Sequence, residues 1–108
     1  MTDDISLLIT SQDYIDDGIV AEKSAAHDYK VLVSPAFELD GATYRVVLDG
    51  HHSLAAALAD GVEPEIVELS QCDHDAICFL DEGQVDSFLQ AVWMGHDYRF
   101  AATGELVW

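Results

Sequence analysis

The chain has 108 residues, half of them hydrophobic, and its 21 acidic residues against 4 basic ones give a formal net charge of −17. This charge excludes direct binding to nucleic acid or to an anionic membrane surface, because both depend on basic side chains. The length indicates a single domain over residues 1–108. Without a bilayer-spanning apolar run or the basic start of a secretory signal, a cytoplasmic protein is expected.

Two strand candidates occupy the first third of the chain. Residues 5–9 form a short apolar run, and residues 29–33 (Tyr-Lys-Val-Leu-Val) have the β-branched composition of a strand. Between them, residues 11–18 end in Asp-Gly and fit a loop or a single helical turn. Residues 19–27 fit either a weak helix or an irregular crossing.

A hairpin is predicted next. Asp40-Gly41 is a strong two-residue turn signal, and it lies between the apolar residues 36–39 and a strand at 44–48. The second strand of this hairpin leads directly into the central segment of the chain.

The central segment, residues 49–61, begins with an Asp-Gly turn and continues into a helix at 53–59, which is almost entirely helix-forming residues. Ser53 or Asp49 is the expected N-cap, and Gly61 is the expected left-handed stop. A glycine turn that opens a helix directs backbone N–H groups outward, which is typical of anion-binding sites.

The last third contains one clear amphipathic helix. Residues 65–69 read as a strand and residues 76–80 as a short apolar run. Apolar residues at spacings of three and four predict a helix over 83–94, and residues 98–108 read as a closing hairpin. Four aromatic residues are assigned to packing within these elements: Trp93, Tyr98, Phe100 and Trp108. If Trp108 is exposed, it is instead an anchor for a partner.

No metal site is expected. Cys72 and Cys78 are expected to be free thiols, and with His74 they do not have the spacing of a zinc finger. His51 and His52 are adjacent, so their side chains diverge. One is expected to pack or to form a hydrogen bond in the turn and the other to be exposed.

The sequence Asp49-Gly50-His51-His52-Ser53, between a strand and an Ala-rich helix that ends at Gly61, resembles the signature of the ParB/sulfiredoxin-like superfamily. The resemblance implies a mixed α/β domain with a small mixed sheet and short helices, whose central turn holds nucleotide phosphates. Members include a CTP-dependent DNA clamp, an ATP-using sulfinic-acid reductase and a free-serine kinase. The cofactor implied is ATP or CTP with Mg²⁺.

Carried over by position, the resemblance places Asp49, Gly50, His51, His52 and Ser53 around the phosphates. The family usually has arginine where this chain has Ser53, and that arginine supplies positive charge and paired hydrogen bonds.

Arg45, on the preceding strand, compensates for this loss only if its side chain faces the turn. The turn has no cysteine, which disfavours the reductase chemistry. A nucleotide-dependent kinase or NTPase needs a catalytic carboxylate that position alone does not identify.

Two functions follow from these features. The first is a small acidic domain that binds a nucleotide or phosphate through the 49–53 turn without catalysis. The alternative is an acidic inhibitor that mimics nucleic acid and blocks a basic nucleic-acid-binding partner, as anti-defence proteins of phages do.

Overall fold

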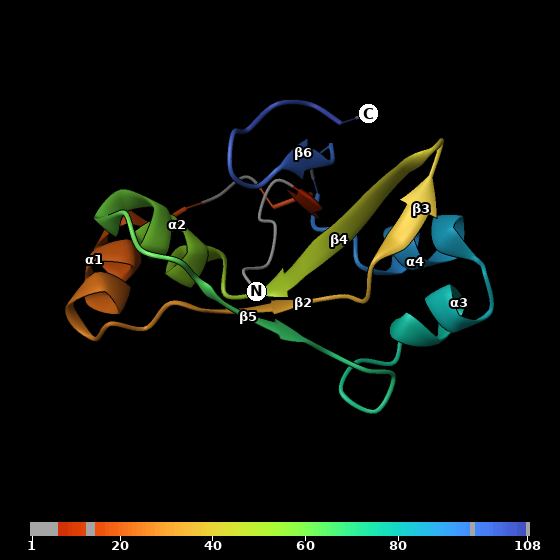
Figure 1. The fold of residues 1–108 in the computed structure, drawn as a ribbon, viewed down its shortest axis with the longest axis horizontal. Coiled ribbons are helices and arrows are strands. Elements are labelled where there is room, and N and C mark those ends of the chain that lie inside the picture. Colours follow the sequence, from red (N-terminus) through yellow and green to blue (C-terminus); the bar gives the residue numbers. More distant parts are fainter. Residues whose placement is uncertain (1–6, 13–14, 96, 108) are drawn as a thin grey trace.

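The computed structural model describes residues 7–12, 15–95 and 97–107, and this part of the chain forms the mixed α/β fold that the sequence predicts (Figure 1). Its strands are β1 (Leu8–Thr10), β2 (Lys30–Val33), β3 (Phe37–Leu39), β4 (Ala42–Asp49), β5 (Glu65–Glu68) and β6 (Arg99–Phe100). Its helices are α1 (Asp17–Ala25), α2 (His51–Asp60), α3 (Ile77–Asp81) and α4 (Val85–Ala91).

The strands make one mixed sheet in the order β5-β2-β4-β1-β6, and β3 pairs with β4 outside this path. β1 is parallel to β4, and β5 is parallel to β2, whereas β2 and β4 are antiparallel. The first two helices lie together at one end of the molecule and α3 and α4 at the other (Figure 1). None of the helices in the described ranges is long and apolar enough to cross a membrane.

The predicted Asp40-Gly41 turn is confirmed. Leu39 pairs with Ala42, so the loop has two residues, and both have positive φ, 53° for Asp40 and 83° for Gly41. This is the type I′ geometry, whose twist matches that of the flanking strands.

The long strand β4 supplies both faces of the core. Val46 and Val47 are adjacent and both buried, and they enter different hydrophobic clusters because successive side chains of a strand point to opposite faces. Val46 packs with Phe88 of α4, and Val47 packs with Leu54 of α2. One face of the sheet is therefore covered by the central helix and the other by the C-terminal helices.

The structure corrects two predictions at the C-terminal end. The 83–94 segment is helical only over Val85–Ala91, because the preceding apolar run forms a separate helix, α3, and Gly83 separates the two with a φ of 75°. Trp93 was predicted to pack, but it lies beyond the end of α4 and is 59% exposed.

The other elements largely follow the prediction. The 19–27 segment is helical within α1, the 65–69 strand is observed as β5, and Tyr98 is buried. Within residues 98–107 the chain turns back on itself through an antiparallel bridge between Arg99 and Leu106 and through hydrogen bonds from Phe100 N–H to Glu105 and from Val107 N–H to Tyr98, and β6 also pairs with β1. Parts of the predicted 5–9 strand, and Trp108, lie outside the described residues.

Candidate functional site

The helix α2 begins at the central turn without a side-chain cap. Gly50 is the N-cap residue with a φ of 88°, and the predicted caps Ser53 and Asp49 are both wrong. Asp49 Oδ1 instead accepts the N–H of Gly50 at 2.7 Å, and Ser53 lies inside the helix.

The first turn of α2 therefore keeps unpaired donors. In the part of the chain that the structure describes, the N–H groups of His51, His52 and Ser53 donate to no acceptor, and the first intrahelical bond runs from Leu54 to Gly50 at 2.9 Å. Free N–H groups and the positive end of the helix dipole favour an anion at this place.

A small pocket opens beside this turn. It has a volume of about 200 Å³, and its lining residues come from α1, β2, the loop between them and the central turn. They are Lys23, Asp28, Lys30, Leu32, Asp49, Gly50 and Ser53. Typical small-molecule sites measure roughly 300–1,000 Å³, so this pocket is sized for a compact group such as phosphate rather than for a whole nucleotide.

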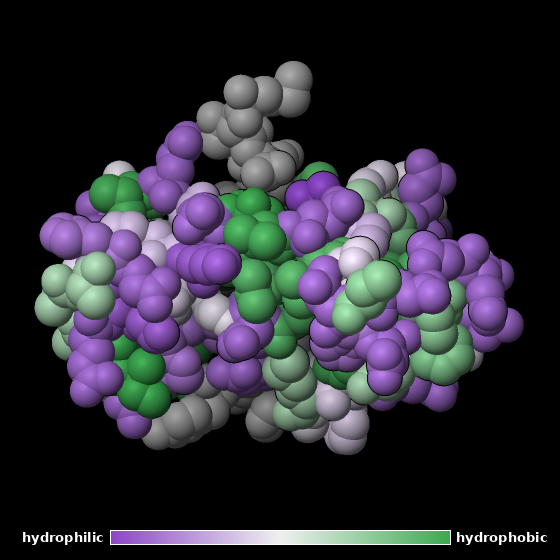
Figure 2. Space-filling model, turned by 90° about the horizontal axis from the view of Figure 1, so that it is seen from below, coloured by the Kyte–Doolittle hydropathy of each residue, from purple (hydrophilic) through white to green (hydrophobic). Residues whose placement is uncertain are grey.

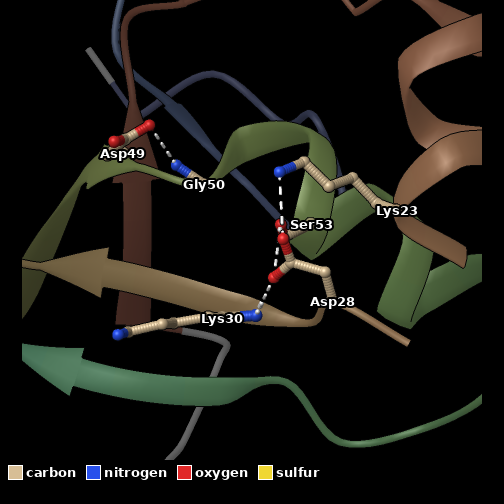
Figure 3. A network of polar contacts seen from close by, with 6 residues as sticks. All are labelled: Lys23, Asp28, Lys30, Asp49, Gly50 and Ser53. Atoms are coloured by element: carbon tan, nitrogen blue, oxygen red, sulfur yellow. Dashed lines mark hydrogen bonds and ion pairs between the residues drawn. The ribbon is translucent and has the colours of Figure 1, made fainter. Parts of the chain in front are cut away.

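Two of the four basic residues of the chain lie at this pocket (Figure 3). Lys23 Nζ contacts Asp28 Oδ2 at 3.0 Å. Among the described residues, the Lys30 ammonium has no hydrogen-bond or ion-pair partner, although the chain carries 21 carboxylic side chains. The pocket is thus lined by two lysines and two carboxylates, Asp28 and Asp49, and the exposed Lys30 side chain extends away from the turn.

Asp28 is the carboxylate of the pocket that contacts Lys23, and Asp49 is a second carboxylate in its lining. Its Oδ1 accepts from the backbone N–H of Lys30 at 3.3 Å and is 3.5 Å from Ser53 Oγ. The Lys23 ammonium, followed by the Lys30 N–H, holds the pKa of Asp28 below its ordinary value, while partial burial opposes this shift. The carboxylate therefore competes with any external anion for Lys23 and Ser53.

Both histidines of the turn connect α2 to other elements. His51 Nε2 is 2.7 Å from Thr10 Oγ1 on β1, and burial lowers the pKa of His51 to about 4. His52 Nε2 accepts the N–H of Asp16, the N-cap of α1, at 3.1 Å. Neither imidazole lines the pocket, and His52 is half-buried rather than exposed.

Arg45 lies away from the turn. Its guanidinium donates to Glu68 on β5 at 2.9 Å, and it does not line the pocket. Of the six residues predicted for the site, the structure brings Asp49, Gly50 and Ser53 together at the pocket. It places the side chains of His51, His52 and Arg45 in other contacts.

Three residues of the pocket are not predicted from the sequence: Lys23, Asp28 and Lys30. They reach the pocket only when α1 and the start of β2 pack beside the turn. One signal was available in the sequence. The chain has only four basic residues, so the position of each lysine indicates where an anion could bind. The alternation of a strand also places Lys30 and Leu32 on the same face of β2.

Cys72 and Cys78 are free thiols, as predicted. Within the described ranges, no group of three or more His, Cys, Asp or Glu side chains is placed to hold a metal ion.

Comparison with protein-family models, curated proteins and solved structures gave no match.

Proposed function

We propose that this chain is a small acidic domain that binds a phosphate group of a nucleotide or similar ligand at the pocket beside the central turn, without catalysing its transfer. The observation that carries the proposal is the coincidence, at one pocket, of an uncapped helix N-terminus and two lysines, of which Lys30 has no ion-pair partner among the described residues. These two features supply the donors and the charge that a phosphate requires. The resemblance of residues 49–61 to the ParB/sulfiredoxin-like signature agrees with the same site.

The proposed ligand pose follows from the size and lining of the pocket. The phosphate oxygens accept from the backbone N–H groups of the first turn of α2 and from the Ser53 hydroxyl. The exposed Lys30 side chain, which points away from the turn in Figure 3, swings toward the phosphate to supply charge. The remainder of a nucleotide extends beyond the pocket, because about 200 Å³ cannot enclose it. ATP or CTP with Mg²⁺ is the first ligand to test, and the metal enters with the nucleotide rather than through a protein site.

Millimolar ATP, CTP or pyrophosphate is expected to raise the Tm of the protein by on the order of 5 °C, since a ligand that binds only the folded state stabilises it. Lys30→Glu should abolish this rise. Arg99→Glu, which makes the same charge change on β6, should retain it. Differential scanning fluorimetry measures all three, and equal responses of the two variants would contradict the proposed site.

Asp28→Asn is expected to increase the affinity for phosphate. The change removes the carboxylate that competes for Lys23, and it keeps an oxygen that can accept from the Lys30 N–H and the Ser53 hydroxyl. Relief of one like charge near the ligand should lower the Kd by about three- to tenfold. Isothermal titration with pyrophosphate measures it.

Asp60→Asn is the matched control for Asp28→Asn. It also removes a hydrogen-bonded carboxylate, one that accepts from Ser24 and Tyr29, but this group is not part of the pocket. An equal gain in both variants would show that net charge alone sets the affinity.

The surface charge supports a second function, binding to a basic protein at its nucleic-acid site. All carboxylic side chains in the described ranges are exposed or half-buried, so the acidic residues are available to a partner. A captured partner that high salt releases, and whose DNA binding this chain inhibits, would support this function. Absence of a partner at low salt would argue against it.

A further inference from the structure

The strand β5 forms an open edge of the sheet. It pairs with β2 on one side, and along its other side no strand is present in the described part of the chain. Glu65 N–H donates to Tyr29 and Leu69 N–H donates to Val33, both on the side of β2. Because successive residues of a strand alternate, the N–H and C=O groups of Ile66 and Glu68 point away from the sheet.

Apolar surface accompanies this edge. Val67 is half-buried and belongs to neither core cluster, and its cross-strand neighbour Leu32 is also half-buried. The lower side of the molecule in Figure 1, where β5 lies, shows a strip of hydrophobic side chains with hydrophilic areas on both sides (Figure 2). An extended segment on the β5 edge would cover part of this strip.

The charges beside the edge determine which segment fits it. Glu65 and Glu68 are exposed at the two ends of β5, and Glu63 precedes the strand. Arg45 contacts Glu68 at 2.9 Å and Lys30 lies opposite Glu65 on β2, so each of these two glutamates also has a basic neighbour within the protein. A second copy of the chain is disfavoured, because antiparallel self-pairing would set Glu65 opposite Glu68 of the other copy, in two molecules of charge −17 each. With the net charge of −17, the edge therefore favours a basic strand over an acidic one.

We propose that β5 binds an extended segment of a basic partner protein as an added strand. Its pattern of acidic, apolar, apolar and acidic residues is the same in both directions, so the complementary pattern is basic, apolar, apolar, basic for either strand orientation. The partner's main chain pairs with Ile66 and Glu68, its apolar residues lie opposite Ile66 and Val67, and its basic residues lie opposite the two glutamates. This inference rests on the second function proposed above, and it names the surface and the mode of binding.

The probe is a capped peptide, Thr-Lys-Val-Val-Lys-Thr, titrated into isotopically labelled full-length protein at low salt. Amide resonances of Ile66 and Glu68 are expected to shift most. The isomer Lys-Val-Thr-Thr-Val-Lys, which has the same charge and composition, should bind about tenfold more weakly. Equal binding of the two peptides, or shifts spread over the whole acidic surface, would overturn the proposal.

Backbone pairing is tested on the peptide, so that folding of the protein is not affected. N-methylation of one valine removes an N–H that faces β5, and N-methylation of the other removes one that faces solvent. One methylated peptide should lose about tenfold in affinity and the other should bind like the parent. If both bind like the parent, strand addition is wrong.

Glu65→Lys and Glu22→Lys separate the edge from the general charge. Both side chains are exposed and both changes raise the net charge equally, but Glu22 lies on α1. Glu65→Lys should weaken peptide binding about tenfold and Glu22→Lys by less than about twofold. Equal effects of the two variants would be consistent with binding of a basic partner by general charge but would contradict binding at β5. No binding of either peptide, together with self-association in sedimentation experiments, would point to β5 pairing between copies instead.

Discussion

Gly50→Ala is expected to lower the free energy of unfolding by about 3 kcal/mol or more, through two independent costs. The first is the backbone conformation, since φ is 88° and L-residues avoid this region. The second is steric, because an added Cβ would lie 2.5 Å from the Lys30 carbonyl oxygen and 3.0 Å from Val31 Cα. Both contacts are to the backbone of β2, which cannot rotate away. Urea denaturation at neutral pH measures the loss.

Gly61→Ala is the matched control. Gly61 ends the same helix with a φ of 68°, and a Cβ there meets no atom within 4 Å. This variant bears the conformational cost alone, about 1 kcal/mol. If Gly50→Ala and Gly61→Ala were equally destabilising, the close approach of the turn to β2 would not constrain the fold.

The same close approach shapes the candidate site. Gly50 brings the start of α2 against the backbone of Lys30, which lines the pocket, while the Lys30 side chain extends away from the turn (Figure 3). A partly folded Gly50→Ala protein should therefore lose phosphate binding together with stability. Gly61→Ala should bind normally.

The central turn and its helix could be predicted because their signals are local. Gly50 and Gly61 have left-handed conformations that few other residues adopt, and the Ala-rich stretch between them has high helix propensity. The Asp40-Gly41 hairpin is equally local, since two adjacent residues determine its turn type.

The lining of the site could not be predicted in this way. Lys23 and Lys30 lie on different elements and reach the pocket only through the packing of α1 beside α2. The contact of Arg45 with Glu68 joins β4 to β5 across β2, and no local pattern indicates it. The exposure of Trp93 likewise depends on where α4 ends, and helix ends are weakly determined by periodicity.

The buried imidazole of His51 is expected to make the protein sensitive to mild acid. Burial is the main cause of its low pKa; His52 acts in the same direction and the Asp49 carboxylate opposes it. His51 titrates at about 4 in the folded protein and near 6.5 when unfolded, so the unfolded state binds the proton more readily between these values. The contribution of the neutral His51 side chain to the free energy of unfolding is therefore fully present above pH 6.5, and it is lost as the pH decreases toward 4.

The size of the effect follows from the shift in pKa. A difference of about 2.5 units corresponds to about 3 kcal/mol lost across this pH range. His51→Gln keeps a side chain that can form a hydrogen bond with Thr10 Oγ1 but does not titrate. Between pH 7 and 4, the variant should therefore lose about 3 kcal/mol less free energy of unfolding than the wild-type protein. His27→Gln, at an exposed position, should follow the wild type.

Denaturant titrations at a series of pH values give this difference. NMR titration of the His51 ring in the wild-type protein gives the pKa directly, even if the glutamine variant does not fold. An ordinary pKa for His51 would contradict the burial of this side chain between α2 and β1. A low pKa with no loss of stability in acid would mean that the unfolded chain also protects the imidazole.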